Sequence, residues 1–144
     1  MKTLTNTVLS SQAGYGITLL RILVGIIFVA HGGQKLFGLF GGYGLEGTGQ
    51  WMESIGITPG YYLAMLSGAA EFFGGLALIV GLLARPAALA LTFTMLVAIV
   101  KVHLANGLFM SNNGYEFALA LMAASLAILI EGAGKLSIDN ALAR

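Results

Sequence analysis

Seven side chains that could bind a small molecule or exchange protons with it lie inside or at the edges of long apolar runs. Glutamate and histidine are common proton acceptors in protein sites, and lysine supplies a positive charge with hydrogen-bond donors. A charge at the centre of an apolar membrane helix costs roughly 3 kcal/mol on the insertion scale, so such residues should gather in one sheltered place. The seven are His31, Gln34, Lys35, Glu71, Lys101, His103 and Glu116.

The expected site depends on Glu71, which stands near the middle of an apolar run. A carboxylate there should be buried and paired, and its candidate partners are His31, Lys35 and Lys101. Residues 31, 34 and 35 share one helix face, because their spacings are three and four residues. One interpretation is a polar pocket, open to the outer side of a membrane, that binds a small molecule or passes protons. The alternative is a structural ion pair that fixes helix register.

Other roles for the remaining polar residues stay open. Lys35 and Lys101 could instead extend outward to the membrane surface, and His103 could cap the end of its helix. His31 and His103 lie at similar depths on different helices, which makes axial haem ligation a further hypothesis. The chain has no cysteine, which excludes a thiolate nucleophile or an iron–sulfur cluster of its own. No zinc pattern, nucleophile triad or phosphate loop occurs, so we predict no metal site and assign no catalytic residue.

The composition indicates which solvent surrounds these residues. The chain has 144 residues, of which 58% are hydrophobic and 9% charged, against about 25% charged in a soluble domain. Its surface must therefore face lipid, and the net charge of +1 offers no basic surface for nucleic acid. We predict an all-α, four-transmembrane-helix bundle formed by a single domain over residues 1–144. The expected helices cover about 17–37, 62–83, 86–104 and 115–132.

The basic residues predict how the bundle is oriented. Lysine and arginine concentrate on the cytoplasmic side of membrane proteins. With four crossings, both termini would be cytoplasmic and the seven site residues would lie between the midplane and the outer surface, with Lys35 and Lys101 on the outer side. The five basic residues on or near the inner side are Lys2, Arg21, Arg85, Lys135 and Arg144.

The first outer loop, from about Gly38 to Tyr61, is rich in glycine and contains one segment that could be helical. Thr48 could cap a short helix and Gly56 could end it. Trp51 would anchor this helix in the membrane interface. A plain loop is the alternative interpretation.

Several motifs resemble those of the DoxX-like membrane proteins. The segment His31-Gly32-Gly33-Gln34-Lys35-Leu36 is similar to the motif that ends their first helix. Their second-helix motif and tight turn resemble Glu71-Phe72-Phe73-Gly74-Gly75-Leu76 followed by Gly81 and Arg85-Pro86. The outer-loop segment at residues 50–56 and the tail at residues 132–139 are also similar. The resemblance covers residues 17–140.

The resemblance implies a four-helix protein of the bacterial inner membrane, with Lys35, Glu71 and Arg85 at motif positions. It also implies a link to quinone-dependent oxidoreductases and membrane complexes, so a quinone is the expected cofactor and a redox enzyme the expected protein partner. Three functions follow as hypotheses. The first is a redox-linked subunit that binds a quinone-like or other small molecule, the second a non-enzymatic scaffold, and the third a small-solute or proton carrier. Whether the protein is an enzyme, and how it oligomerises, stays open.

Overall fold

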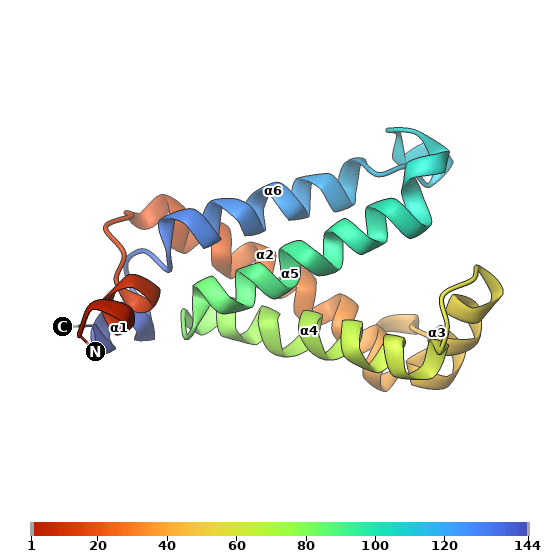
Figure 1. The fold of residues 1–144 in the computed structure, drawn as a ribbon, viewed down its shortest axis with the longest axis horizontal. Coiled ribbons are helices and arrows are strands. Elements are labelled where there is room, and N and C mark those ends of the chain that lie inside the picture. Colours follow the sequence, from red (N-terminus) through yellow and green to blue (C-terminus); the bar gives the residue numbers. More distant parts are fainter. Residues whose placement is uncertain (1, 144) are drawn as a thin grey trace.

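Four long helices lie lengthwise beside one another and form the body of the protein (Figure 1). The computed structural model describes residues 2–143, and every regular element in that part of the chain is helical. Arg144, which contributed to the orientation argument, lies outside the described residues. The long helices are α2 (Tyr15–Phe37), α4 (Gly60–Val80), α5 (Ala84–Ala98) and α6 (Glu116–Glu131).

The short elements lie at the two ends of this bundle (Figure 1). Helices α1 (Lys2–Leu9) and α7 (Ile138–Leu142) lie together at one end, which we call the terminal end. The opposite end, called the α3 end, carries η1 (Leu39–Gly41) and α3 (Gly44–Ser54). It also carries the connection from α5 to α6, which contains η2 (Ile99–His103), η3 (Leu104–Asn106) and η4 (Met110–Asn112).

The apolar runs of the sequence correspond to these helices, with small shifts at the ends. Three helical stretches are long and apolar enough to cross a membrane: Tyr15–Phe37, Gly60–Val80 and Ala84–Asn106, with mean hydropathies of 1.8, 1.8 and 2.0. Helix α4 ends three residues before the predicted boundary because Gly81 adopts a left-handed conformation (φ 70°). Helix α6 has 16 residues, a length of about 24 Å at 1.5 Å per residue.

The first connection contains a helix that begins earlier than predicted. Thr48 was expected to precede the helix, but α3 begins at Gly44 and Thr48 lies within it, buried. Gly41 and Gly44 have positive φ angles (76° and 68°), which reverse the chain directly after α2. The helix therefore starts four residues sooner than Thr48.

Helices α2 and α4 approach closely because glycines line their contact. A Cβ added at Gly25 would lie 2.7 Å from the carbonyl oxygen of Gly75, and one added at Gly32 would collide with the backbone nitrogen of Phe72. Small residues permit this approach in lipid, where van der Waals packing holds helices together. The resulting pair of helices carries both His31 and Glu71.

The interior and the surface of the bundle are both apolar. Phe28, Leu78, Leu91 and Ile128 are at most 1% exposed and form the centre of the core. Large apolar side chains also cover the outward faces of the long helices, among them Leu19, Ile26, Leu66, Phe73, Leu89, Phe93 and Ile130. Exposed apolar surface of this extent is typical of a face that contacts lipid.

Buried polar groups fasten the terminal end. Arg21 is fully buried and donates hydrogen bonds to carbonyl oxygens of α4 and of the segment before α7. Asp139, 1% exposed, accepts from the backbone nitrogens of Leu83 and Ala84 at 2.7 and 2.9 Å and so caps the start of α5. These contacts join α2, α4, α5 and the C-terminal segment.

Candidate functional site

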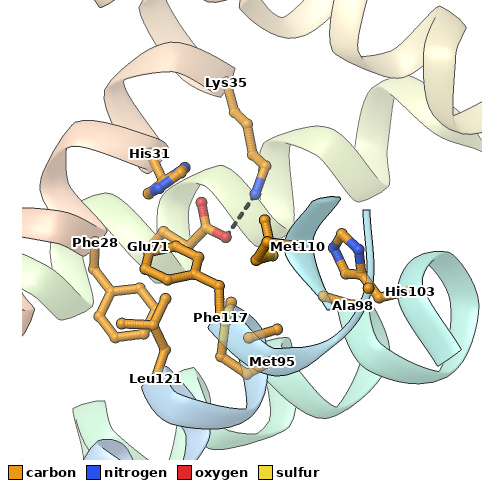
Figure 2. A pocket seen from close by; sticks show the side chains of 12 residues that line it. Phe28, His31, Lys35, Glu71, Met95, Ala98, His103, Met110, Phe117 and Leu121 are labelled. Carbon is orange, nitrogen blue, oxygen red and sulfur yellow. Dashed lines mark hydrogen bonds and ion pairs between the residues drawn. The ribbon is translucent and has the colours of Figure 1, made fainter. Parts of the chain in front are cut away.

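A pocket with a volume of about 140 Å³ lies among the four long helices toward the α3 end. Its walls come from α2, α4, α5, η2, α6 and the loop before α6 (Figure 2). His31, Lys35, Glu71 and His103 are its ionisable side chains, and the rest of the wall is mainly apolar and aromatic. The pocket thus combines a few polar groups with an apolar lining, which is the usual character of a small-molecule site.

Lys35 and Glu71 form an ion pair at one side of this pocket. The distance from Lys35 Nζ to Glu71 Oε1 is 2.5 Å (Figure 2). The Glu71 side chain is 3% exposed and that of Lys35 is 25% exposed. Lys35 therefore turns inward to Glu71, instead of extending to the membrane surface, because pairing offsets the cost of a buried carboxylate.

The second carboxylate oxygen of Glu71 has no partner. Oε2 is buried, and no hydrogen-bond donor reaches it among the residues that the structure describes. A buried acceptor without a donor costs about 1–3 kcal/mol, and more when it is charged. Oε2 is therefore an acceptor that a donor from outside the described residues would satisfy.

His103 enters the pocket from a π-helical turn. The turn η2 (Ile99–His103) continues α5 with wider hydrogen bonding, a feature that is frequent at functional sites. His103 Nδ1 lies 2.9 Å from the carbonyl oxygen of Asn113. Because a carbonyl oxygen only accepts, Nδ1 carries a proton in this contact, and Nε2 is the acceptor of the neutral ring.

Aromatic rings complete the pocket. The exposed ring of His31 lies 6.0 Å from the ring of Phe117, measured between centroids, with a tilt of 47°. Phe28 lines the pocket from α2 and is 1% exposed (Figure 2). These rings offer flat apolar surface close to the Lys35–Glu71 pair.

Three of the seven residues singled out from the sequence do not line the pocket. The Gln34 side-chain amide donates to the carbonyl oxygen of Phe40 at 3.3 Å, and Glu116 Oε2 accepts from the Met110 backbone nitrogen at 3.0 Å. Lys101 is exposed. Gln34 and Glu116 therefore hold the two loops of the α3 end, and Glu116 also positions Met110, which lines the pocket.

Sequence reasoning did not identify the apolar part of the lining. Met95, Ala98 and Leu121 have the same types as the residues that pack the core, so no local signal separates them. Sequence reasoning placed Arg21 on or near the inner side but did not predict that its side chain is fully buried within the bundle. The position of Arg21 in the sequence could have indicated this burial. A charged side chain in the first turns of an apolar helix requires buried hydrogen-bond acceptors.

A second and larger groove contains no ionisable group. It lies between α3, α4 and α5, has a volume of about 340 Å³, and is lined by apolar side chains with Ser67 and Thr94. Both hydroxyls donate to carbonyl oxygens of their own helices. Across residues 2–143, no group of three or more His, Cys, Asp or Glu side chains is placed to hold a metal ion. The chemistry of the molecule is thus concentrated in the pocket with Glu71.

Comparison with known proteins identifies the family. The sequence model of the DoxX family matches residues 16–104, which include His31, Lys35, Glu71 and His103. The chain belongs to the DoxX family. It is therefore a membrane protein, as the apolar helices indicate.

Several DoxX-type relatives cover most of the chain. "Inner membrane protein YqjF" of Escherichia coli is 36% identical over 133 residues, which are 88% of this chain and 92% of YqjF. "Putative oxidoreductase CatD" of Bacillus subtilis is 34% identical over 113 residues, 78% of each chain. "Uncharacterized membrane protein Rv3486" of Mycobacterium tuberculosis is 31% identical over 136 residues, which are 87% of this chain and 80% of Rv3486. No solved structure matches the chain.

Proposed function

We propose that this DoxX-family protein is a redox-linked membrane subunit that binds a small quinone-like molecule in the pocket beside Glu71. The observation that carries the proposal is the Lys35–Glu71 pair, whose two residues line a ring-sized space and whose buried carboxylate has one oxygen without a donor in the described residues. The word oxidoreductase in the name of CatD supports the redox part of the proposal.

The size and lining of the pocket favour a single ring. An engineered protein cavity of 150 Å³ holds benzene, whereas drug-sized ligands occupy roughly 300–1,000 Å³. The pocket, with about 140 Å³, therefore suits one six-membered ring with its substituents and is too small for a haem. Phe28 and Phe117 would face the ring, and aromatic contacts of this kind are worth about 0.5–1.5 kcal/mol beyond area burial.

The residues of this chain would bind the ligand, orient it and move protons. A quinone-type ligand supplies the electron chemistry when it is bound. Glu71 Oε2 would accept a proton from a hydroxyl group of the reduced ligand, and Lys35 Nζ offers donors to an oxygen of the ligand. A protein partner, such as a redox enzyme of the membrane, would exchange the electrons.

The proposal includes the arrangement of the chain in the bacterial inner membrane. We propose a single domain over residues 1–144 with four crossings, formed by α2, α4, α5 and α6. The terminal end would face the cytoplasm, and α3 would lie in the outer interface with Trp51 as its anchor. Arg21, Arg85 and Lys135 lie at the terminal end, in agreement with the preference of basic residues for the cytoplasmic side. The pocket would then open toward the outer leaflet.

The direct test is to fill the pocket. Ala118 is buried and lines the pocket, whereas Ala120 is exposed two residues further along α6. We expect the wild-type protein, purified in mild detergent, to retain a ring-containing small molecule that mass spectrometry and absorption spectra identify. Ala118→Leu should lose this molecule, and the matched control Ala120→Leu should keep it.

The main competing function is a scaffold in which the Lys35–Glu71 pair serves helix register alone. In that case Ala118→Leu would change nothing except stability, and neither co-purified molecules nor added hydroquinone would bind to the wild-type protein. Either of these results would refute the proposed ligand site.

A further inference from the structure

We infer that the pocket selects a hydroxylated ring, the reduced form of a quinone-like ligand, over a ring that presents only carbonyl or ether oxygens. The inference rests on the proposed function and specifies which chemical form the site takes. It follows from the acceptors that the pocket leaves unsatisfied.

The first unsatisfied acceptor is Glu71 Oε2. Lys35 Nζ lies 2.5 Å from the other oxygen, Oε1, in an ion pair. Oε2 is buried and has no donor within the described residues. An ionised oxygen gains a charge-assisted hydrogen bond from a ligand hydroxyl, whereas a carbonyl or ether oxygen at the same place would repel it.

Lys35 and Glu71 together can recognise one hydroxyl group. Lys35 Nζ has three hydrogens, of which the Glu71 contact uses one, so it can donate a second to the oxygen of a ligand hydroxyl. The hydrogen of that hydroxyl then points to Glu71 Oε2. Figure 2 shows the ring of His31 beside the same carboxylate, and this exposed ring can turn to admit the ligand.

A second acceptor comes from a different element of the wall. Asn113 accepts from Nδ1 of His103 at 2.9 Å, and in the neutral tautomer that this contact selects Nε2 has a free lone pair. Glu71 belongs to α4 and His103 to η2, and both line the pocket. A ring with two hydroxyl groups therefore has an acceptor available for each hydrogen, whereas a dione brings no hydrogen to either acceptor and can only accept from Lys35.

Phenol and anisole test this inference because anisole carries a methyl group in place of the hydroxyl hydrogen of phenol and so has no donor. Binding to the purified protein in detergent is measured by ligand-detected NMR, with Ala118→Leu as the background for partition into micelles. We expect phenol to bind roughly 10- to 100-fold more tightly than anisole, the effect of one hydrogen bond to a charged acceptor. Equal binding of the two probes would overturn the inference and leave the proposed site in place. No binding of either probe above the background would refute the proposed site itself.

The variant Glu71→Gln provides a second test, in which the preference for phenol should be lost or reversed. The amide oxygen of the new side chain keeps the contact with Lys35, and its NH₂ group replaces Oε2, so a donor stands where the acceptor was. Anisole should then bind at least as tightly as phenol. An unchanged preference for phenol in a variant whose circular dichroism matches the wild type would contradict the role given to Oε2.

Discussion

Replacing Arg21 by lysine should destabilise the protein, although the charge is conserved. The Arg21 side chain is fully buried, and its three nitrogens donate to five backbone carbonyl oxygens. Two of these carbonyls belong to the last turn of α4, where the helix itself supplies no donors. The distances lie between 2.5 and 3.1 Å, and the acceptors are the carbonyl oxygens of Leu78, Ile79, Ala133, Lys135 and Leu136.

The expected loss follows from counting donors. The Thr18 hydroxyl also donates to the Lys135 carbonyl at 2.5 Å, so four carbonyls rely on the guanidinium. A lysine ammonium has three hydrogens, so at least one of these four carbonyls would lose its donor, and those of Leu78 and Ala133 are buried. A buried carbonyl without a donor costs about 1–3 kcal/mol, so Arg21→Lys should lower the free energy of unfolding by about that amount.

The measurement is unfolding of the purified protein by sodium dodecyl sulfate, followed by the circular dichroism of its helices. The matched control is Arg85→Lys, because Arg85 also donates to backbone carbonyls but does so at the partly exposed surface of α1 and α6. Water can satisfy those acceptors, and this variant should stay within about 0.5 kcal/mol of the wild type. Equal stabilities for Arg21→Lys and the wild type would refute the reasoning about the buried carbonyls.

Two further predictions concern helix packing and orientation. Gly32→Ala should lower the free energy of unfolding by about 1–3 kcal/mol in the same assay, because the added Cβ would collide with the backbone of Phe72. The control Gly16→Ala has open space around its Cβ, so it should leave stability unchanged or raise it by up to about 1 kcal/mol. Similar losses for both variants would contradict the packing argument. The chain has no cysteine, so a single cysteine can report topology. An impermeant maleimide should label Ser111→Cys in intact cells and Ala141→Cys only after permeabilisation, and the reverse pattern would overturn the proposed orientation.

The apolar runs of the sequence were sufficient to predict the long helices. The spacing of His31 and Lys35 and the depth of Glu71 also made Lys35 one of three candidate partners for the carboxylate. The choice among these candidates could not be predicted, since it depends on how far α2 and α4 are shifted along each other. Gly25 and Gly32 determine that contact, and their role becomes visible only when the backbone of α4 is in place.

Other features depend on contacts between residues far apart in the chain. The π-helical turn that ends at His103 has no signature in a sequence that reads as a continuous apolar helix. The two short helices at the terminal end, α1 and α7, were not among the predicted elements, because neither is long or apolar. Ser11, which precedes α2, accepts from the Gly134 backbone nitrogen at 3.1 Å, and its own backbone nitrogen donates to Asn140. Such tertiary hydrogen bonds stabilise short helices that have little stability of their own.

The two ends of the bundle are held together in different ways, and this difference favours the α3 end as the place of function. At the terminal end, Arg21 and Asp139 join the helices through buried hydrogen bonds, so that separating them would expose charged groups without partners. At the α3 end, the ion pair between α2 and α4 is Lys35–Glu71, which is satisfied on one carboxylate oxygen only. A ligand that donates to the second oxygen would complete this link. Binding should therefore stabilise the α3 end in particular, while the terminal end keeps the bundle assembled when the pocket is empty.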